Sequence, residues 1–171
     1  MAEPDLRALA ERLQEICLAG GLTVATAESC TGGRIGDVLT DVAGASGHLR
    51  GGVVAYSNHA KEALLGVPAS VIGRHGAVSA QVASAMASGA RARLGADLGV
   101  AVTGIAGPSG ATAGKPVGLT YVAVADEAGI ELRRFCWPGD RGSNKAASAR
   151  AALEMLVERA AAIAGGERGA G

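Results

Sequence analysis

Hydrophobic residues recur along the chain with two spacings, which predict helices in some segments and strands in others. In the opening segment they stand three and four residues apart, a spacing that gathers them on one face of a helix. Asp5 precedes this run as an N-cap, and two glycines at positions 20 and 21 end it. The sequence therefore predicts an amphipathic helix whose apolar face holds Leu6, Leu9, Leu13 and Ile16.

The middle of the chain alternates short β-prone runs with segments of helical spacing. Each run ends in turn-forming residues, and the first two are followed directly by apolar residues at helical spacing. Ser57 and Asn58 cap the second of these helices, which runs through residue 65, and Ser79 caps a later alanine-rich helix. The predicted strands are residues 22–27, 53–56 and 98–102.

The end of the chain predicts a hairpin and a closing helix. Two β-rich runs, residues 117–125 and 130–137, are joined by a short turn sequence, and a helix follows from about Ser143 to Ile163. Strand–helix units followed by a hairpin and a C-terminal helix predict an α/β fold, a three-layer α/β/α domain with a mixed sheet. We expect residues 1–165 to form this single domain and residues 166–171 to form a flexible tail.

The net charge and the aromatic content of the chain argue against some classes of binding partner. The chain has 171 residues, 49% of them hydrophobic, and 16 basic side chains balance 16 acidic ones. With a net charge of zero, the chain has no overall electrostatic attraction to nucleic acid or to an acidic membrane. Aromatic residues make up only 2%, too few for base-stacking platforms. We therefore expect neither a nucleic-acid nor a membrane partner.

The cysteines and the first residues of the sequence are typical of a cytoplasmic protein. The three cysteines stand at positions 17, 30 and 136 with no paired spacing, which predicts neither a disulfide framework nor a metal site. The first residues show no apolar run behind a basic region. We expect a cytoplasmic protein that uses neither metal nor cofactor. Glycine, with 27 residues, is the one unusual component.

Three common site motifs do not fit. The sequence before Lys115 lacks the first glycine of a phosphate-binding P-loop, and Pro116 follows the lysine. The dinucleotide-binding glycine spacing does not occur at residues 103–110. Ser29 follows a strand as in a nucleophile elbow, but Ala27 and Thr31 stand where that motif needs glycines.

Polar groups nevertheless gather at the ends of the three predicted strands. If these strands are parallel neighbours, their carboxyl ends share one edge, where open α/β sheets bind ligands. Ser29 needs a base to become nucleophilic, and no histidine stands nearby in the sequence, so Lys61 is the available base. Lys61 must then be neutral, which desolvation in an apolar crevice can bring about.

Each of these residues also has a simpler interpretation. Ser29 can act as the cap of the helix that follows it, and Lys61 can be a solvated helix lysine beside Glu62. Tyr56 can be a half-buried packing residue at a strand end. Cys30 is either a buried packing residue or, with a lowered pKa, a thiolate rival to Ser29.

The ordered motifs resemble a known family. In order and spacing, the chain is similar to the CinA carboxy-terminal domain family from about residue 6 to residue 160, and the family's stand-alone members are nicotinamide mononucleotide deamidases. Departures from the family's usual pattern are Ala111 in place of glycine, Gly114 in place of an acidic residue, and Asn144-Lys145 in place of a β-branched residue and arginine. The resemblance rests on residues 27–33, 52–58 with Lys61 and 64–67, 76–79, 101–108, 115–118 and 139–141.

The resemblance implies an amidohydrolase of bacterial pyridine-nucleotide salvage. It would convert nicotinamide mononucleotide, a small-molecule nucleotide substrate, to nicotinic acid mononucleotide and ammonia without a metal. At the matching positions, Ser29 would be the nucleophile, Lys61 its general base and Tyr56 a partner in proton transfer. The substrate-binding candidates are Thr31, Gly32, Gly33, Asn58, Thr103, Gly104, Gly107, Lys115, Arg141 and Lys145, with backbone N–H groups of the two glycine loops as an oxyanion hole.

Two other functions stay open at this point. One is a catalytically degenerate nucleotide-binding or scaffold domain linked to competence or DNA-damage responses, as the family's name suggests. The other is an amidase for a different small carboxamide. The family and the apolar opening helix also lead us to expect a homodimer.

Overall fold

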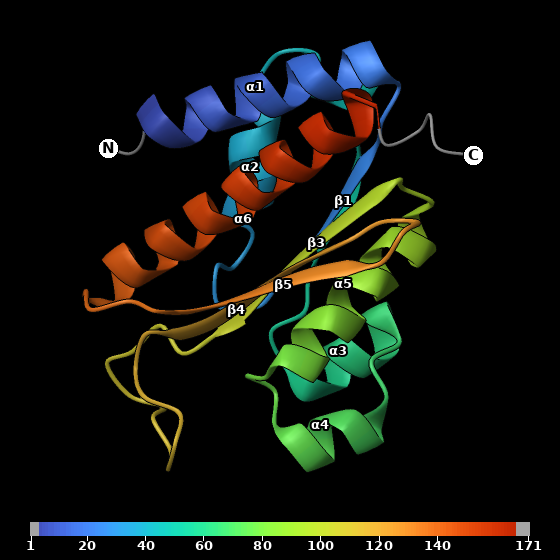
Figure 1. The fold of residues 1–171 in the computed structure, drawn as a ribbon. Helices are drawn as coiled ribbons and strands as arrows, with labels where there is room; N and C mark the ends of the chain where they lie inside the picture. Colours follow the sequence, from blue (N-terminus) through green and yellow to red (C-terminus); the bar gives the residue numbers. More distant parts are fainter. Residues whose placement is uncertain (1–3, 167–171) are drawn as a thin grey trace.

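A five-stranded mixed sheet forms the middle of the molecule (Figure 1). The computed structural model describes residues 4–166, so residues 167–171 of the predicted tail lie outside the described residues. The strands are β1 (Val24–Glu28), β2 (Leu49–Val54), β3 (Leu98–Gly104), β4 (Leu119–Ala125) and β5 (Ile130–Cys136), in the order β2-β1-β3-β4-β5. The first three are parallel, and β4 and β5 are antiparallel to their neighbours. The predicted mixed sheet and hairpin are confirmed.

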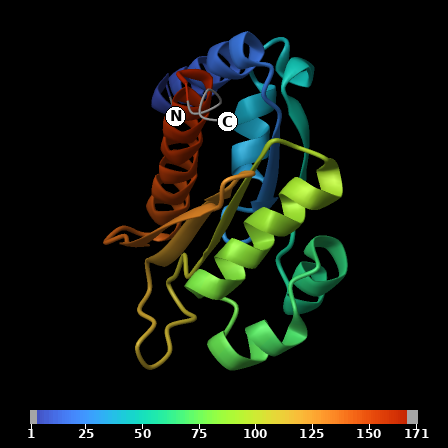
Figure 2. The same cartoon turned by 45° about the vertical axis from the view of Figure 1, so that its right-hand side comes forward.

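Helices cover both faces of the sheet, as the two views in Figures 1 and 2 show. One face carries α1 (Pro4–Gly20), α2 (Arg34–Thr40) and α6 (Arg141–Ala164). The other carries α3 (Asn58–Leu65), α4 (Ala69–His75) and α5 (Ala80–Leu94). A short 3-10 turn, η1 (Ala45–Gly47), precedes β2. The predicted three-layer α/β/α fold is therefore confirmed.

Each face of the sheet has its own hydrophobic core, because side chains alternate along a strand. Val24 and Val100 point toward α1, α2 and α6, where larger side chains such as Leu153 fill the core. On the other face the strands present small residues such as Ala25 and Ala101, against which α5 packs. These paired cores hold β1 and β3 buried on both sides.

Glycines allow close contacts between α5 and the sheet and between neighbouring strands of the sheet. A Cβ on Gly99 of β3 would lie 2.2 Å from the carbonyl oxygen of Ala87 in α5, so no side chain fits there. A Cβ on Gly52 of β2 would lie 2.2 Å from Oγ1 of Thr26. Part of the glycine excess therefore serves close packing of strands and helices.

Several predicted boundaries differ from the structure. The first helix already includes Asp5, which was predicted as its N-cap. The second strand runs from Leu49 to Val54, earlier than the predicted 53–56, because Gly51 and Gly52 pair with β1 within the ladder instead of ending it. The last helix begins at Arg141, with the side chain of Asp140 as its N-cap, two residues before the predicted start. The helix α4 was not predicted.

The topology brings three strand ends to one edge of the sheet. Residues after β1, β2 and β3 emerge side by side, because β1 lies between the two others and is parallel to both. The first two continue into α2 and α3, on opposite faces. No helix within residues 4–166 is long and apolar enough to cross a membrane.

Candidate active site

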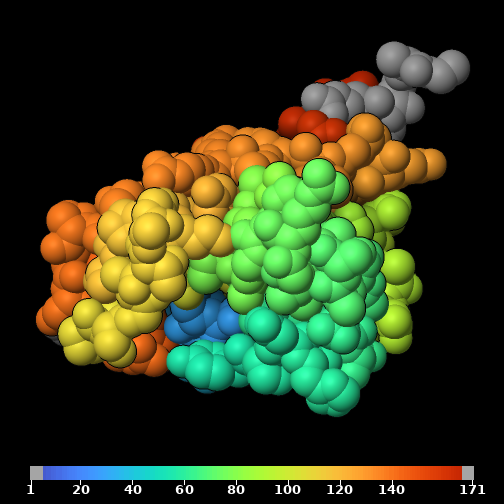
Figure 3. All heavy atoms as spheres, turned by 90° about the horizontal axis from the view of Figure 1, so that it is seen from below, coloured from blue at the N-terminus to red at the C-terminus, as the bar shows by residue number. Residues whose placement is uncertain are grey.

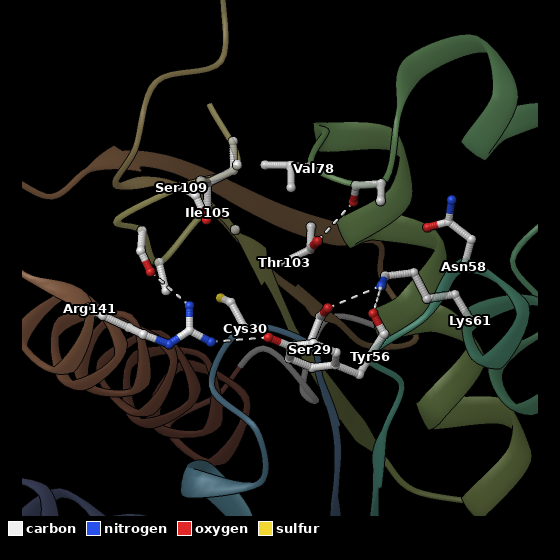
Figure 4. A pocket seen from close by; sticks show the side chains of 15 residues that line it. Ser29, Cys30, Tyr56, Asn58, Lys61, Val78, Thr103, Ile105, Ser109 and Arg141 are labelled. Atoms are coloured by element: carbon white, nitrogen blue, oxygen red, sulfur yellow. Dashed lines mark hydrogen bonds between the residues drawn. The ribbon is translucent and has the colours of Figure 1, made fainter. Parts of the chain in front are cut away.

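Ser29 and Lys61 meet where β1 and β2 end. Ser29 directly follows β1, and Lys61 lies in the first turn of α3. Lys61 Nζ lies 3.0 Å from Ser29 Oγ, and Figure 4 shows the two side chains pointing toward each other. Both are buried, with exposed fractions of 1% for Lys61 and 8% for Ser29. The structure thus brings together the two residues that the sequence singled out.

The surroundings of Lys61 suit a neutral amine. Nζ donates to the carbonyl oxygens of Ala55 at 3.1 Å and Tyr56 at 3.4 Å, and the third direction faces Ser29. No carboxylate of the described residues forms an ion pair with Lys61, and desolvation by burial lowers the pKa of its ammonium group. A neutral amine has two N–H donors and one lone pair, which matches two carbonyls and one hydroxyl.

Local sequence fixes the position of the lysine. The hydroxyl of Ser57 accepts a hydrogen bond from Ala60 N and caps α3, as predicted. The backbone N–H of Lys61 donates to Ser57 O, so Lys61 closes the first turn of the helix. A side chain at this position points back toward the helix N-terminus and therefore toward the strand ends. The interpretation of Lys61 as a solvated surface lysine is wrong.

The turn after β1 presents the serine hydroxyl. Gly32 and Gly33 adopt positive φ angles of 65° and 104°, which favour glycine. The N-cap of α2 is Gly33, without a side-chain cap, so Ser29 does not cap that helix as the simpler interpretation proposed. The N–H of Ser29 donates to Val102 O, which anchors its backbone to β3.

Cys30 is a poor competitor for the role of nucleophile. Its thiol is buried, and burial raises its pKa to about 11. That pKa includes lowering by a backbone hydrogen bond, a smaller raising effect of the Glu28 charge, and still smaller lowering effects of the nearby Lys61 and Lys145. Near neutral pH the group is therefore a thiol, which is far less nucleophilic than a thiolate.

A cavity of about 250 Å³ opens over the pair. In Figure 3 a hollow lies between the yellow loop after β3 and the green segment around α4, with blue residues at its base. The three predicted catalytic residues, Ser29, Tyr56 and Lys61, all line this cavity. Five of the predicted substrate-binding residues line it as well, namely Asn58, Thr103, Gly104, Gly107 and Arg141. Its remaining lining residues are Cys30, Ala77, Val78, Ile105, Ala106, Ser109 and Gly110.

Arg141 joins two walls of the cavity. Its guanidinium group donates to the carbonyl oxygen of Gly107 at 2.8 Å and to the phenol oxygen of Tyr56 at 3.1 Å. Tyr56 has an exposed fraction of 60%, and only its backbone carbonyl contacts Lys61. The phenol oxygen thus accepts a hydrogen bond from the arginine, and the role of Tyr56 in proton transfer stays a prediction. Tyr56 is not the half-buried packing residue of the simpler interpretation.

Two buried polar residues hold the cavity walls in place. Thr103 Oγ1 donates to Ala77 O at 2.8 Å and ties the end of β3 to the loop before α5. Asn144 Nδ2 donates to Ala106 O at 3.1 Å and fastens the loop after β3 to α6. Asn144, one of the departures from the family pattern, thus connects the glycine loop to the helix that carries Arg141.

The remaining predicted binding residues lie outside the cavity lining. Lys115 donates to His75 O at 2.6 Å and links the loop before β4 to the end of α4. A Cβ on Gly32 would lie 3.7 Å from Lys145 Nζ, which places this lysine beside the turn after Ser29. Thr31 is buried and donates to Glu28, while Gly32 and Gly33 shape the turn.

The sequence did not single out several contributors to the site. Ala77 and Val78 line the cavity from a loop whose position depends on the unpredicted helix α4. Glu28 was not among the candidate site residues, yet its carboxylate is buried. Within residues 4–166, no three histidine, cysteine or acidic side chains are grouped so that they could hold a metal ion.

The fold and the site together define an α/β domain with a buried serine–lysine pair in a cleft at the strand ends. The family model described as CinA C-terminal domain matches residues 6–160. The chain therefore belongs to the CinA C-terminal domain family.

Curated relatives carry only general names. A CinA-like protein of Geobacter sulfurreducens is 52% identical over 139 residues, covering 81% of this chain and 34% of the relative. A CinA-like protein of Gemmatimonas aurantiaca is 47% identical over 163 residues, covering 95% of this chain and 37% of the relative. The chain thus spans about a third of the length of the curated relatives it matches.

Solved structures share the whole fold. The competence/damage inducible protein CihA from Agrobacterium tumefaciens superposes with a TM-score of 0.89 at 42% identity, covering 92% of this chain and 97% of that one. A CinA superfamily protein from Escherichia coli gives 0.88 at 31% identity, with 93% and 94% covered.

Proposed function

We propose that the protein is an amidohydrolase that deamidates nicotinamide mononucleotide to nicotinic acid mononucleotide and ammonia. The observation that carries the proposal is the 3.0 Å contact between Ser29 Oγ and the buried amine of Lys61. A serine becomes nucleophilic when an adjacent base takes its proton, and a desolvated lysine is such a base. The resemblance to the CinA family supports the choice of substrate.

Acylation begins with the neutral amine. Lys61 Nζ takes the proton of Ser29 Oγ as this oxygen attacks the carboxamide carbon. The carbon–nitrogen bond then breaks, and the leaving nitrogen takes the proton from Lys61 and departs as ammonia. Ser29 is left as an ester of the nicotinate group, and Lys61 is neutral again.

In hydrolysis of the ester, water takes the place of Ser29 as the nucleophile, and Ser29 Oγ becomes the leaving group. Lys61 takes a proton from a water molecule as the water oxygen attacks the ester carbon, and the bond from that carbon to Ser29 Oγ breaks. Ser29 regains its proton from Lys61, and the carboxylic acid product leaves and releases its proton to solvent as a carboxylate. The backbone at Gly104, which lines the cavity, is our candidate for stabilising the oxyanion in both steps.

Substrate binding is assigned to the outer part of the cavity. The phosphate of a mononucleotide is an anion, and Arg141 is the arginine that lines the cavity. Its guanidinium group is already held toward the cavity by Gly107 and Tyr56, which reduces the entropy lost on binding. We propose that Arg141 contacts the phosphate and that the ring of Tyr56 forms the adjacent wall.

Ammonia release from a panel of carboxamides tests the substrate. We expect turnover of nicotinamide mononucleotide and much weaker turnover of nicotinamide riboside and free nicotinamide, which lack the phosphate. Turnover of the two smaller amides at an equal rate would instead favour a general amidase. Tight binding of the mononucleotide without any ammonia would favour the nucleotide-binding or scaffold alternative.

A further inference from the structure

Glu28 is a buried acid next to the proposed nucleophile. It has an exposed fraction of 1% and ends β1, directly before Ser29. Its carboxylate accepts three hydrogen bonds, from the hydroxyl of Thr31 at 2.6 Å, from Ile35 N at 2.9 Å and from Gly36 N at 3.0 Å. Acids are rarely buried this fully unless their oxygens are satisfied.

These contacts fix both ends of the turn that carries Ser29. Thr31 lies inside the turn, and Ile35 and Gly36 lie in the first turn of α2, where backbone N–H groups lack helical partners. The carboxylate therefore connects the end of β1 to the beginning of α2 across residues 29–33. Ser29 is held between two points that Glu28 ties together.

The backbone of Glu28 also locates the base. Its carbonyl oxygen accepts a hydrogen bond from Ala55 N at 2.8 Å. The carbonyl of Ala55 in turn accepts from Lys61 Nζ at 3.1 Å. One residue thus supports the serine turn through its side chain and the lysine acceptor through its main chain.

We propose that Glu28 is a positioning residue, whose buried carboxylate holds the turn of residues 29–33 so that the Ser29 hydroxyl meets the Lys61 amine. The inference rests on the proposed function. Both carboxylate oxygens must be acceptors because all three partners are donors, and a glutamine amide would place its N–H groups against at least one of them. Glu28 does not touch the reacting atoms, so it acts through Ser29.

The charge of Glu28 has a second effect that fits this role. It raises the pKa of the neighbouring Cys30 thiol, in addition to the effect of burial. Glu28 therefore helps to keep Cys30 protonated while it presents Ser29. The turn offers one nucleophile, although two candidate side chains stand next to each other.

Glu28→Gln tests the proposal against Glu127→Gln, a matched change at an exposed position in the β4–β5 turn. Ammonia release gives kcat and KM, and labelling of Ser29 by a fluorophosphonate probe reports nucleophile activation without the substrate. For Glu28→Gln we expect kcat and labelling rate to fall by about tenfold or more, because misplaced reacting groups lose rate steeply. We expect KM within about twofold of wild type.

Thr31 provides a gentler pair of variants. Thr31→Val removes one bond to the carboxylate and is expected to lower the labelling rate several-fold, whereas Thr31→Ser keeps the hydroxyl and should restore it. If Glu28→Gln does not fold, the two Thr31 variants still test the proposal. Melting temperatures of all variants establish that folded protein is compared.

The outcomes separate the two proposals. Labelling of Ser29 at the wild-type rate in folded Glu28→Gln or in Thr31→Val overturns the role of Glu28 and leaves the proposed function standing. Labelled wild-type protein that releases no ammonia from nicotinamide mononucleotide overturns the proposed function alone. Wild-type protein that is not labelled at Ser29 contradicts both.

Discussion

Lys61 is buried with two carbonyls and a hydroxyl as its partners, and this environment determines its chemistry. A charged ammonium group without a carboxylate partner is disfavoured away from water, so its pKa falls. The same desolvation that destabilises the charged form favours the neutral amine, which is the form that can accept a proton. Under the proposed function, the lysine thus supports activity at the expense of stability.

The pH dependence of stability follows from this shift. Because the pKa of Lys61 is lower in the folded than in the unfolded state, the unfolded chain binds more protons between the lowered pKa and the ordinary lysine pKa of 10.5. The free energy of unfolding of wild type should therefore rise with pH across this window relative to that of Lys61→Met. Urea unfolding at several pH values measures this difference. A difference that does not change with pH would show that the lysine stays charged in the folded protein.

Cys30 gives a second prediction at the residue scale. With a pKa of about 11, its thiol should resist alkylation by iodoacetamide near neutral pH, and Cys30→Ala should keep most of the activity. The exposed Cys136 serves as an internal control, because it should react first. Mass analysis of the modified peptides identifies the site. Inactivation that follows alkylation of Cys30 would favour the thiol as nucleophile.

The sequence could identify Ser29 and Lys61 because strand ends converge in a parallel sheet. It could not predict that Lys61 is buried, since this depends on a contact with a residue 32 positions away. Glu28 was overlooked because an acid after a strand is typical of a solvated turn. Its burial depends on how α2 packs over the strand end, which periodicity does not specify.

Element packing explains why the helix that carries Lys61 stays in place. The alanine-rich α5 lies against α3 without bulky side chains between them. A Cβ on Gly89 of α5 would lie 2.0 Å from the carbonyl oxygen of Leu65, the last residue of α3. The pattern predicted both helices, but not the glycine that lets them touch. It also missed α4, whose few apolar residues give a weak periodicity.

Substitution of two helix glycines by alanine should have opposite effects on stability. Gly89→Ala should destabilise the protein by about 2 kcal/mol or more, because the new methyl group overlaps backbone that must move. Gly73→Ala in α4 meets nothing within 4 Å and should stabilise it by about 0.5–1 kcal/mol through helix propensity. Thermal unfolding of both variants measures the contrast. Equal effects of the two changes would contradict the packing described between α3 and α5.

At the scale of the whole molecule, the cavity lies where the two helical layers meet the sheet edge. Lys61 comes from the layer of α3, and Arg141 comes from α6 on the opposite face. A ligand that touches both would connect the layers across the end of the sheet. The predicted homodimer remains an expectation at this scale, which light scattering can test.

Ligand binding should therefore stabilise the whole domain. At about a hundredfold excess over Kd, nicotinic acid mononucleotide should add about 2.7 kcal/mol, which raises Tm by roughly 5–10 °C in a domain of this size. Arg141→Ala should lose most of this shift, whereas Arg7→Ala on the exposed face of α1 should keep it. Calorimetry or dye-monitored melting gives the values. An unchanged shift in Arg141→Ala would remove this residue from the phosphate site.

The proposed function requires that Ser29, activated by Lys61, cleaves the carboxamide. Its most direct test is the rate of ammonia release from nicotinamide mononucleotide by wild type, Ser29→Ala, Lys61→Ala and Cys30→Ala at matched concentrations of folded protein. We expect turnover by wild type and Cys30→Ala, with the Ser29 and Lys61 variants slower by at least about a thousandfold, as for other nucleophile–base pairs. Undiminished turnover by Ser29→Ala would contradict the proposed role of this serine.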